Sequence, residues 1–223
     1  MAEIAPFFAV PFGFARLDDC APLNEQLRET FLQRAALGAA YANPRPITRR
    51  NQQVYESRFD LFRWPEAPVQ HLKEFCWREL IRWVCELNRY DDKVRAQLLL
   101  YADSWFHITR RGGFFALHNH PMASWSGVYC VDPGGQDVQH PDSGLLSFVS
   151  PMLTSSMFLD AANSQLQGPY AHGVRSLRLE PGQLVLFPSW ILHEVTPFTG
   201  DGERITVSFN AWFRLAADPP ASS

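Results

Sequence analysis

The sequence predicts an α+β protein whose helices come first and whose strands follow. Two segments with an apolar residue every three or four positions lie within residues 21–37 and 65–87. From residue 98 the pattern changes to short runs rich in β-branched and aromatic residues, which are separated by turns with Gly and Pro. This order favours antiparallel strands in a sandwich or barrel, with the helices packed against it.

The N-terminal part is expected to form an apolar arm and two helices. Residues 4–17 are apolar and suit a short strand or an extended arm. In the first helix Leu23, Leu27 and Phe31 recur every fourth residue, and the pattern ends at Gly38. The second helix carries a longer apolar stripe, which is typical of packing against a sheet. Its members are Val69, Leu72, Cys76, Leu80, Trp83 and Leu87.

Short strands are expected through the rest of the chain. Residues 41–65 lack a clear period and predict a loop with one short strand near residues 54–59. Residues 150–173 are irregular and are candidates for a lid. The later strands are expected at residues 98–109, in a short run ending at 118, and at 125–131, 144–149, 175–179, 183–187, 191–195 and 205–213.

We expect a single structural domain made of three parts. Residues 1–97 form the arm and the helices that pack on the strands, residues 98–215 form the strand-rich core, and residues 216–223 form a flexible tail.

Composition excludes several classes of protein. The 223 residues are 46% apolar, and their net charge of −3 comes from 23 acidic and 20 basic residues. No Lys/Arg-rich run is present, so neither nucleic acid nor an anionic membrane is an expected partner. No apolar run is long enough to span a bilayer, and no signal peptide is evident. The four cysteines form no Cys-x-x-Cys pair, and a reduced, cytoplasmic setting is expected.

The residues that suggest chemistry are His118 and His120, with His193 far downstream. On a strand, alternate residues point the same way, so His118 and His120 would present two imidazoles to one point. Neutral imidazole suits Fe, Zn, Cu or Ni. His193 lies in an apolar stretch, where an isolated histidine is more often a hydrogen-bonded core residue. Together with the other two, we interpret it as a third metal ligand.

Arg204 and Thr206 share one face of a predicted strand eleven residues after His193. A guanidinium beside a hydroxyl is a good receptor for a carboxylate, although an Arg next to a turn is often only a surface residue. The usual non-haem iron triad contains one carboxylate, so an acidic residue could replace one histidine. The nearby candidates are Asp103, Asp132, Asp137 and Asp142.

Three blocks of the chain resemble the bacterial 2-oxoglutarate/Fe(II)-dependent oxygenases of the prolyl-hydroxylase-like superfamily. The blocks are Trp105–Arg110 with Gly112 and His118–Pro121, then Trp125–Tyr129, then Pro181–His193 continued by Arg204–Asn210. The resemblance spans about residues 100–213. Four positions depart from it: asparagines are expected in place of His107, Thr109 and Phe115, and a tyrosine in place of Cys130. The substrate is therefore expected to differ from that of relatives.

The resemblance implies a double-stranded β-helix with supporting N-terminal helices. It implies Fe(II) at His118, His120 and His193, with 2-oxoglutarate as co-substrate and its distal carboxylate on Arg204. The activity implied is hydroxylation of an amino acid, a peptide or protein side chain, or a small metabolite, and a homodimer is compatible with it. Further cofactor-binding roles are implied for Thr206, Trp105, Tyr129, Ser126 and Asn210.

Two other classes of function compete with this interpretation. A cupin-type metal-dependent dioxygenase or isomerase would share the His-x-His pair, but the glutamate of its motif is absent because Ser124 and Trp125 stand there. A β-helix protein that binds a ligand without catalysis would not need three histidines and an arginine. Metal analysis and turnover of 2-oxoglutarate to succinate separate the three classes.

Overall fold

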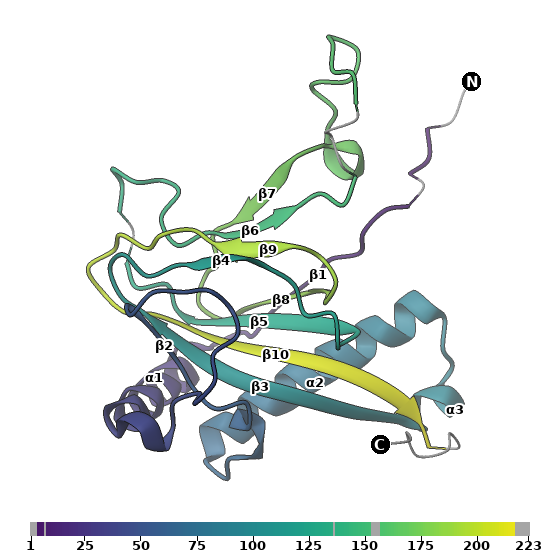
Figure 1. Cartoon of the computed structure of the whole chain (residues 1–223). Coiled ribbons are helices and arrows are strands. Elements are labelled where there is room, and N and C mark those ends of the chain that lie inside the picture. Colours follow the sequence, from purple (N-terminus) through teal and green to yellow (C-terminus); the bar gives the residue numbers. More distant parts are fainter. Residues whose placement is uncertain (1–3, 7, 136, 153–156, 217–223) are drawn as a thin grey trace.

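Two antiparallel sheets face each other, and two helices cover the outer face of the larger sheet (Figure 1). The computed structural model describes residues 4–6, 8–135, 137–152 and 157–216. In the larger, six-stranded sheet the order is β1 (Gly13–Arg16), β8 (Gln183–Pro188), β5 (Trp125–Asp132), β10 (Arg204–Leu215), β3 (Leu98–Thr109) and β2 (Val54–Glu56). The four-stranded sheet has the order β4 (Phe115–His118), β9 (His193–Val195), β6 (Leu146–Val149) and β7 (Val174–Leu177). The predicted order of helices followed by a strand-rich body is confirmed.

The main helices lie where the apolar periodicity predicts them. Helix α1 covers Ala21–Ala36 and helix α2 covers Ala67–Asn88, each with a proline in its first turn, where no backbone N–H is needed. All of the predicted α2 stripe is buried except Leu87. The turn α3 (Asp92–Arg95) is too short for periodicity to reveal, as are the 3₁₀ turns η1 (Gly38–Ala40), η2 (Leu61–Arg63) and η4 (Gly168–Tyr170).

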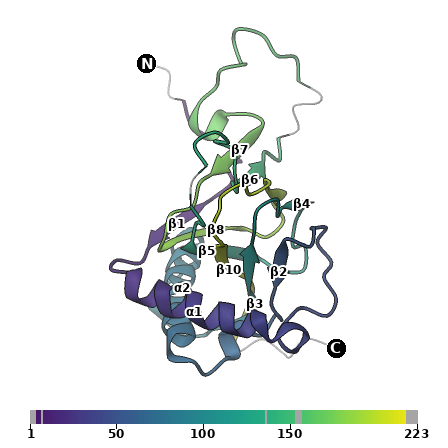
Figure 2. The same ribbon diagram turned by 90° about the vertical axis from the view of Figure 1, so that its left-hand side faces the viewer.

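The larger sheet separates an apolar core from a cavity. Phe106 and Ile108 of β3 point toward the helices and are fully buried, while Trp105 and His107 point to the opposite side. The ring of Phe106 stacks on Phe31 of α1 at 4.3 Å. Burying an aromatic side chain of this kind contributes roughly 1.5–3 kcal/mol. Figure 2 shows both helices on one side of the strands, which leaves the other face free to form a site.

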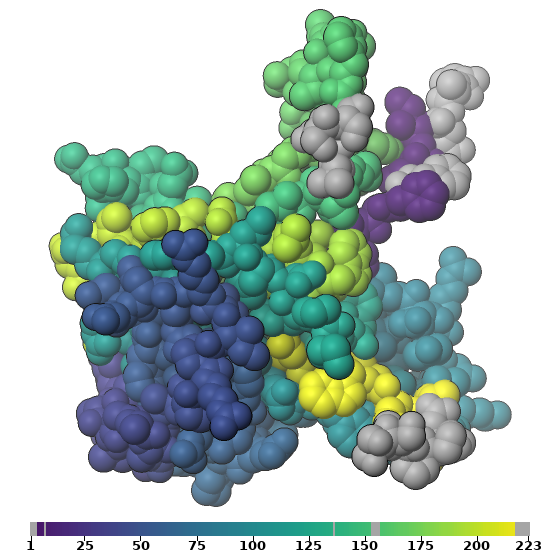
Figure 3. Space-filling view, in the orientation of Figure 1, coloured from purple at the N-terminus to yellow at the C-terminus, as the bar shows by residue number. Residues whose placement is uncertain are grey.

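The sequence makes residues 150–173 a candidate lid, and the described part of this segment stands away from the body. It projects outward beyond β6 and β7, on the same side as the described part of the N-terminal arm (Figures 1 and 3). None of these residues lines the cavity described below. In this conformation the described part of the segment therefore does not cover the site. No described helix has the length and apolar character needed to cross a membrane.

Candidate metal and dicarboxylate site

Three histidines from distant parts of the chain converge on one point. His118 ends β4 and is the register partner of His193, the first residue of β9. His120 lies two residues beyond the end of β4, where its backbone N–H donates to the carbonyl of Ser189 at 2.8 Å. One potential ligand nitrogen from each ring lies within 4.8 Å of those of the other two. Strand pairing places two of the rings, and this backbone contact places the third.

Backbone carbonyls determine which ring nitrogen faces the centre. His118 Nδ1 lies 2.8 Å from the carbonyl oxygen of Ala116, and His193 Nδ1 lies 3.0 Å from that of Ile191. A carbonyl only accepts hydrogen bonds, so both Nδ1 atoms carry hydrogen. The Nε2 lone pairs are then left for a metal, which is the usual arrangement of a ligating histidine with a fixed tautomer.

The surroundings keep the imidazoles neutral. Burial, and then the neighbouring His118, lower the pKa of His120 to about 4. Burial, and then the same neighbour, lower the pKa of His193 to about 3, and burial also lowers the pKa of His118. Neutral imidazole is the ligand form, so the site is ready for a divalent cation. A metal ion fits this set of donors.

Within the described part of the chain, no carboxylate joins the three histidines. Asp132 caps the turn at Gly134 and contacts Arg28, and Asp137 contacts His140. Asp103 lines the cavity but is not part of the cluster. The ligand set favoured here is therefore three imidazoles and not two imidazoles and a carboxylate.

Arg204 opens β10 at one end of the same cavity. Its side chain is buried, and burial lowers the pKa of its guanidinium. Among the described residues no carboxylate lies within ion-pairing distance of it. Thr206, two residues along the strand, is also buried and faces the same space. A buried, unpaired cation beside a hydroxyl requires an anionic ligand, and the carboxylate of a dicarboxylate fits it.

The cavity has a volume of about 820 Å³ and joins the histidines to Arg204. Thr206, Trp105, Ser126 and Asn210 all line it, as expected of residues near a cofactor. Ser126 Oγ donates to Asn210 Oδ1 at 2.7 Å and therefore accepts from Ser189 Oγ at 2.8 Å. This chain of bonds orients Asn210, so its amide N–H groups remain available to a ligand.

Tyr129 is the exception among the predicted site residues. It lies on the helix-facing side of β5, fully buried in the core, and its hydroxyl donates to Asn24 Oδ1 of α1 at 2.7 Å. The geometry does not support the expected cofactor-binding role, because Tyr129 does not line the cavity, whereas Ser126 and Val128 of the same strand do. Tyr129 instead joins helix α1 to the sheet.

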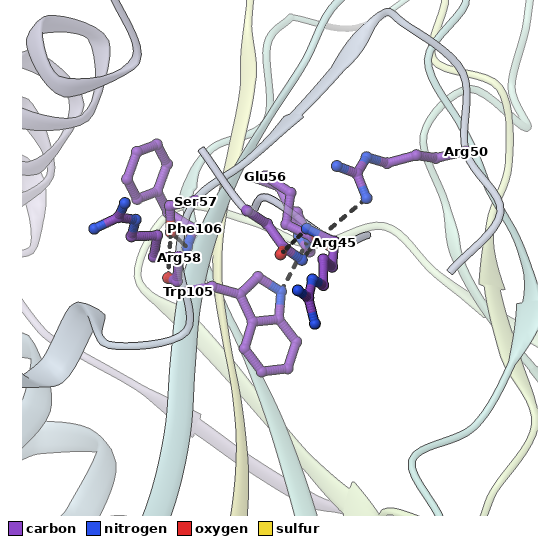
Figure 4. Close-up of polar contacts among 9 residues, drawn as sticks. Arg45, Arg50, Glu56, Ser57, Arg58, Trp105 and Phe106 are labelled. Carbon is purple, nitrogen blue, oxygen red and sulfur yellow. Dashed lines mark hydrogen bonds and ion pairs between the residues drawn. The ribbon is translucent and has the colours of Figure 1, made fainter. Parts of the chain in front are cut away.

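A buried polar network beside the site was not evident from the sequence. Glu56 of β2 accepts from Arg50 at 3.0 Å (Figure 4) and from Asn43 at 2.7 Å. Its other carboxylate oxygen lies 3.0 Å from His107 Nε2. Burial would raise the pKa of Glu56, but the bonds to His107 and Asn43 and the charge of Arg50 lower it to about 2. Burial also lowers the pKa of His107. A single acidic residue in a short strand has no sequence pattern that reveals such partners.

The same nitrogen of His107 also lies 2.9 Å from the indole Nε1 of Trp105. One ring nitrogen cannot satisfy both neighbours, because Trp105 needs a lone pair and the carboxylate of Glu56 needs a hydrogen. Since Glu56 is ionised, the hydrogen is placed between His107 and Glu56. The indole N–H of Trp105 points at this ring nitrogen, so Trp105 and Glu56 compete for His107 Nε2.

The fold and the site together define a class of protein. Facing antiparallel sheets that enclose a histidine cluster and a buried arginine are the architecture of the Fe(II)- and 2-oxoglutarate-dependent oxygenases, with their double-stranded β-helix. The family model described as "Putative 2OG-Fe(II) oxygenase" matches residues 103–210, which include all three histidines and Arg204. Over these residues, which are just under half of the chain, the sequence is similar to the 2OG-Fe(II) oxygenases, and the resemblance of its sequence blocks is confirmed.

Solved structures share the fold. A prolyl-4-hydroxylase from Pseudomonas putida is 19% identical, with 92% of this chain and 93% of that chain covered and a TM-score of 0.57. AviO1 from Streptomyces viridochromogenes Tue57 is 16% identical, with 96% and 94% covered and a TM-score of 0.60. HygX from Streptomyces hygroscopicus is 12% identical, with 91% and 83% covered and a TM-score of 0.52. A comparison with curated proteins finds no match.

Proposed function

We propose that the site hydroxylates a C–H bond of a small molecule or peptide, with iron on His118, His120 and His193 and 2-oxoglutarate anchored by Arg204. The reaction consumes O₂ and 2-oxoglutarate and yields the hydroxylated product, succinate and CO₂. One observation carries the assignment of roles: three neutral imidazoles and an unpaired buried guanidinium share one cavity. The structure of HygX contains nickel, 2-oxoglutarate and hygromycin B, which supports a small-molecule substrate for that fold.

Each group of side chains has a distinct task in this proposal. The histidines would hold the metal, which would activate O₂ for C–H hydroxylation while 2-oxoglutarate is oxidised to succinate and CO₂. Arg204 and Thr206 bind the distal carboxylate, so the other end of the co-substrate points toward the histidines. The amide N–H groups of Asn210 offer hydrogen bonds to oxygen atoms of the ligands. The apolar walls exclude water, which strengthens each of these contacts.

Replacing one ligand tests the proposal directly. His193→Ala should abolish iron binding and lower succinate formation to background, because two imidazoles remain where three are required. Iron is measured by elemental analysis after gel filtration, and succinate is measured in the presence of Fe(II) and 2-oxoglutarate. His71→Ala is the matched control, since His71 is exposed on α2 far from the cavity lining.

Full iron content and succinate formation in His193→Ala would remove this residue from the site. Succinate formation by the wild-type protein separates the oxygenase from a cupin-type enzyme, which does not consume 2-oxoglutarate.

A further inference from the structure

Some charged side chains in the cavity wall have an oppositely charged protein partner, and others do not. Arg204 is an unpaired cation at one end, which the proposed function assigns to 2-oxoglutarate. Glu56 is an anion, and Arg50 pairs with it at 3.0 Å. Asp103 is a second anion in the cavity wall. Among the described residues, no side-chain hydrogen bond and no cation within 4.0 Å accompanies Asp103.

Asp103 lies at the opposite end of the cavity from Arg204. Asp103 is paired with Asn210 across β3 and β10, whereas Arg204 is paired with Thr109. The pair Asp103–Asn210 is six residues along the strands from the pair Thr109–Arg204, which corresponds to roughly 20 Å. Trp105 lies between them, and its ring is 6.0 Å from that of His120. The histidines therefore lie between the anchored co-substrate and Asp103.

The surface around Asp103 is apolar and aromatic. Phe59 packs on Trp105 with a centroid distance of 4.4 Å, and Trp212 lines the cavity one row beyond Asn210. Burial raises the pKa of the Asp103 carboxyl, and the charge of Arg63 only partly opposes this. A half-buried carboxylate without a partner is unfavourable until a cation reaches it. Aromatic faces add attraction for a cation that enters between them.

We propose that the substrate carries a positively charged nitrogen, an amine or a guanidinium, which binds Asp103 between Phe59, Trp105 and Trp212. This inference rests on the proposed function and names the substrate class of the same site. Asp103 and Trp105 are roughly 7 Å apart along the strand, and the histidines lie beyond Trp105. The hydroxylated carbon is therefore several bonds away from the charged nitrogen.

The test compares two probes of equal shape. Phenethylamine is a cation at neutral pH, and 2-phenylethanol is its neutral counterpart. Both are titrated into the full chain with Fe(II) and 2-oxoglutarate under argon, and again without metal. Dissociation constants are obtained from the NMR signals of the tryptophan indole N–H groups. Asp103→Asn removes the charge without changing the shape, and Asp18→Asn removes the same charge from the exposed β1–α1 connection.

We expect the amine to bind about 10-fold more tightly than the alcohol. Asp103→Asn should remove this preference and leave alcohol binding unchanged, while Asp18→Asn should behave as wild type. Equal affinity for the two probes, or an equal loss for both in Asp103→Asn, overturns the proposal. The titration measures binding under argon, without turnover, so its result is independent of the succinate assay. A preference for the amine without succinate formation would refute the oxygenase assignment alone. Succinate formation without a preference for the amine would refute only the role of Asp103.

A further arm distinguishes two sources of the cation. A short peptide with one internal lysine is titrated beside the same peptide with norleucine in that place. Tighter binding of the lysine peptide that depends on Asp103 identifies a peptide side chain, and a preference confined to phenethylamine identifies a small molecule. A norleucine peptide that binds as tightly as the lysine peptide, together with no preference for phenethylamine, overturns the proposal.

Discussion

Arg204 illustrates how one residue can be unfavourable for the empty protein and favourable for the complex. Its guanidinium is buried, and no described carboxylate compensates it. Removing a charge of this kind from water costs free energy, which an anionic ligand restores. The residue is therefore better explained by ligand binding than by stability.

Arg204→Gln should raise the 2-oxoglutarate concentration for half-maximal succinate formation about 10- to 100-fold. The physical reason is the loss of a charge-assisted contact worth roughly 1.5–3 kcal/mol, at about 1.4 kcal/mol per factor of ten. The free energy of unfolding without ligand should not fall. Arg214→Gln is the control, because Arg214 is on the same face of β10 but does not line the cavity. An unchanged requirement for 2-oxoglutarate in Arg204→Gln would contradict the assigned role.

At position 127, close packing against Phe209 leaves no room for a side chain. A Cβ at this position would lie 2.2 Å from Cζ of Phe209, a fully buried ring that faces the helices. Gly127→Ala should lower the free energy of unfolding by about 1–3 kcal/mol, because the ring must move within a packed core. Urea unfolding measures the change. The double variant with Phe209→Leu should lose less than the sum of the single variants, and strict additivity would argue against the clash.

At the scale of elements, strand β2 pairs with β3 and is also held by the polar contacts of Glu56. In the folded protein the pKa of Glu56 is about 2, which is below the ordinary value of 4.5. The ionised carboxylate therefore contributes fully to the free energy of unfolding above pH 4.5, and this contribution is lost as the pH falls toward 2. At pH 3.5 the loss should be about 1 kcal/mol relative to pH 7.

Glu56→Gln should lack this part of the acid destabilisation, measured by urea unfolding at pH 7 and pH 3.5. Glu74→Gln on the exposed face of α2 is the control and should keep the wild-type pH dependence. If Glu56→Gln lost as much free energy of unfolding between pH 7 and pH 3.5 as the wild type, the ionised Glu56 would not stabilise the fold.

The elements also show what periodicity can predict. Helices α1 and α2 were predictable because they are long and bury apolar residues spaced three or four apart, whereas the four residues of α3 give no period. Strand β9 begins at His193, two residues later than predicted, because Ile191 and Leu192 belong to the turn after β8. Side chains alternate along a strand, so Ser126 and Tyr129, three positions apart on β5, are expected on opposite faces of the sheet. Applied strictly, this rule would have placed Tyr129 away from Ser126.

On the scale of the whole molecule, the site lies between the two sheets. His118 and His193 belong to the four-stranded sheet, and Arg204 belongs to the six-stranded sheet. Iron and 2-oxoglutarate bound together would therefore connect the sheets. A ligand that binds only the folded protein stabilises it in proportion to its binding free energy.

Fe(II) with 2-oxoglutarate, each at about 100 times its dissociation constant, should raise Tm by about 5–10 °C. This range follows from at least about 2.7 kcal/mol of stabilisation at roughly 2–4 °C per kcal/mol for a domain of this size. Calorimetry under argon measures the shift, and EDTA should reverse it. A shift of equal size in His193→Ala would mean that the ligands bind elsewhere.

The sequence by itself determined the order of helices and strands, the three histidines and Arg204, because these depend on local periodicity and on rare residue types at defined spacing. Only the tertiary structure decided that no described carboxylate joins the histidines, that Glu56 and His107 form a buried pair, and that Asp103 has no described ion-pair partner. These facts depend on contacts between residues far apart in the chain. Which distant side chains meet is set by how the two sheets pack, and no local pattern encodes it.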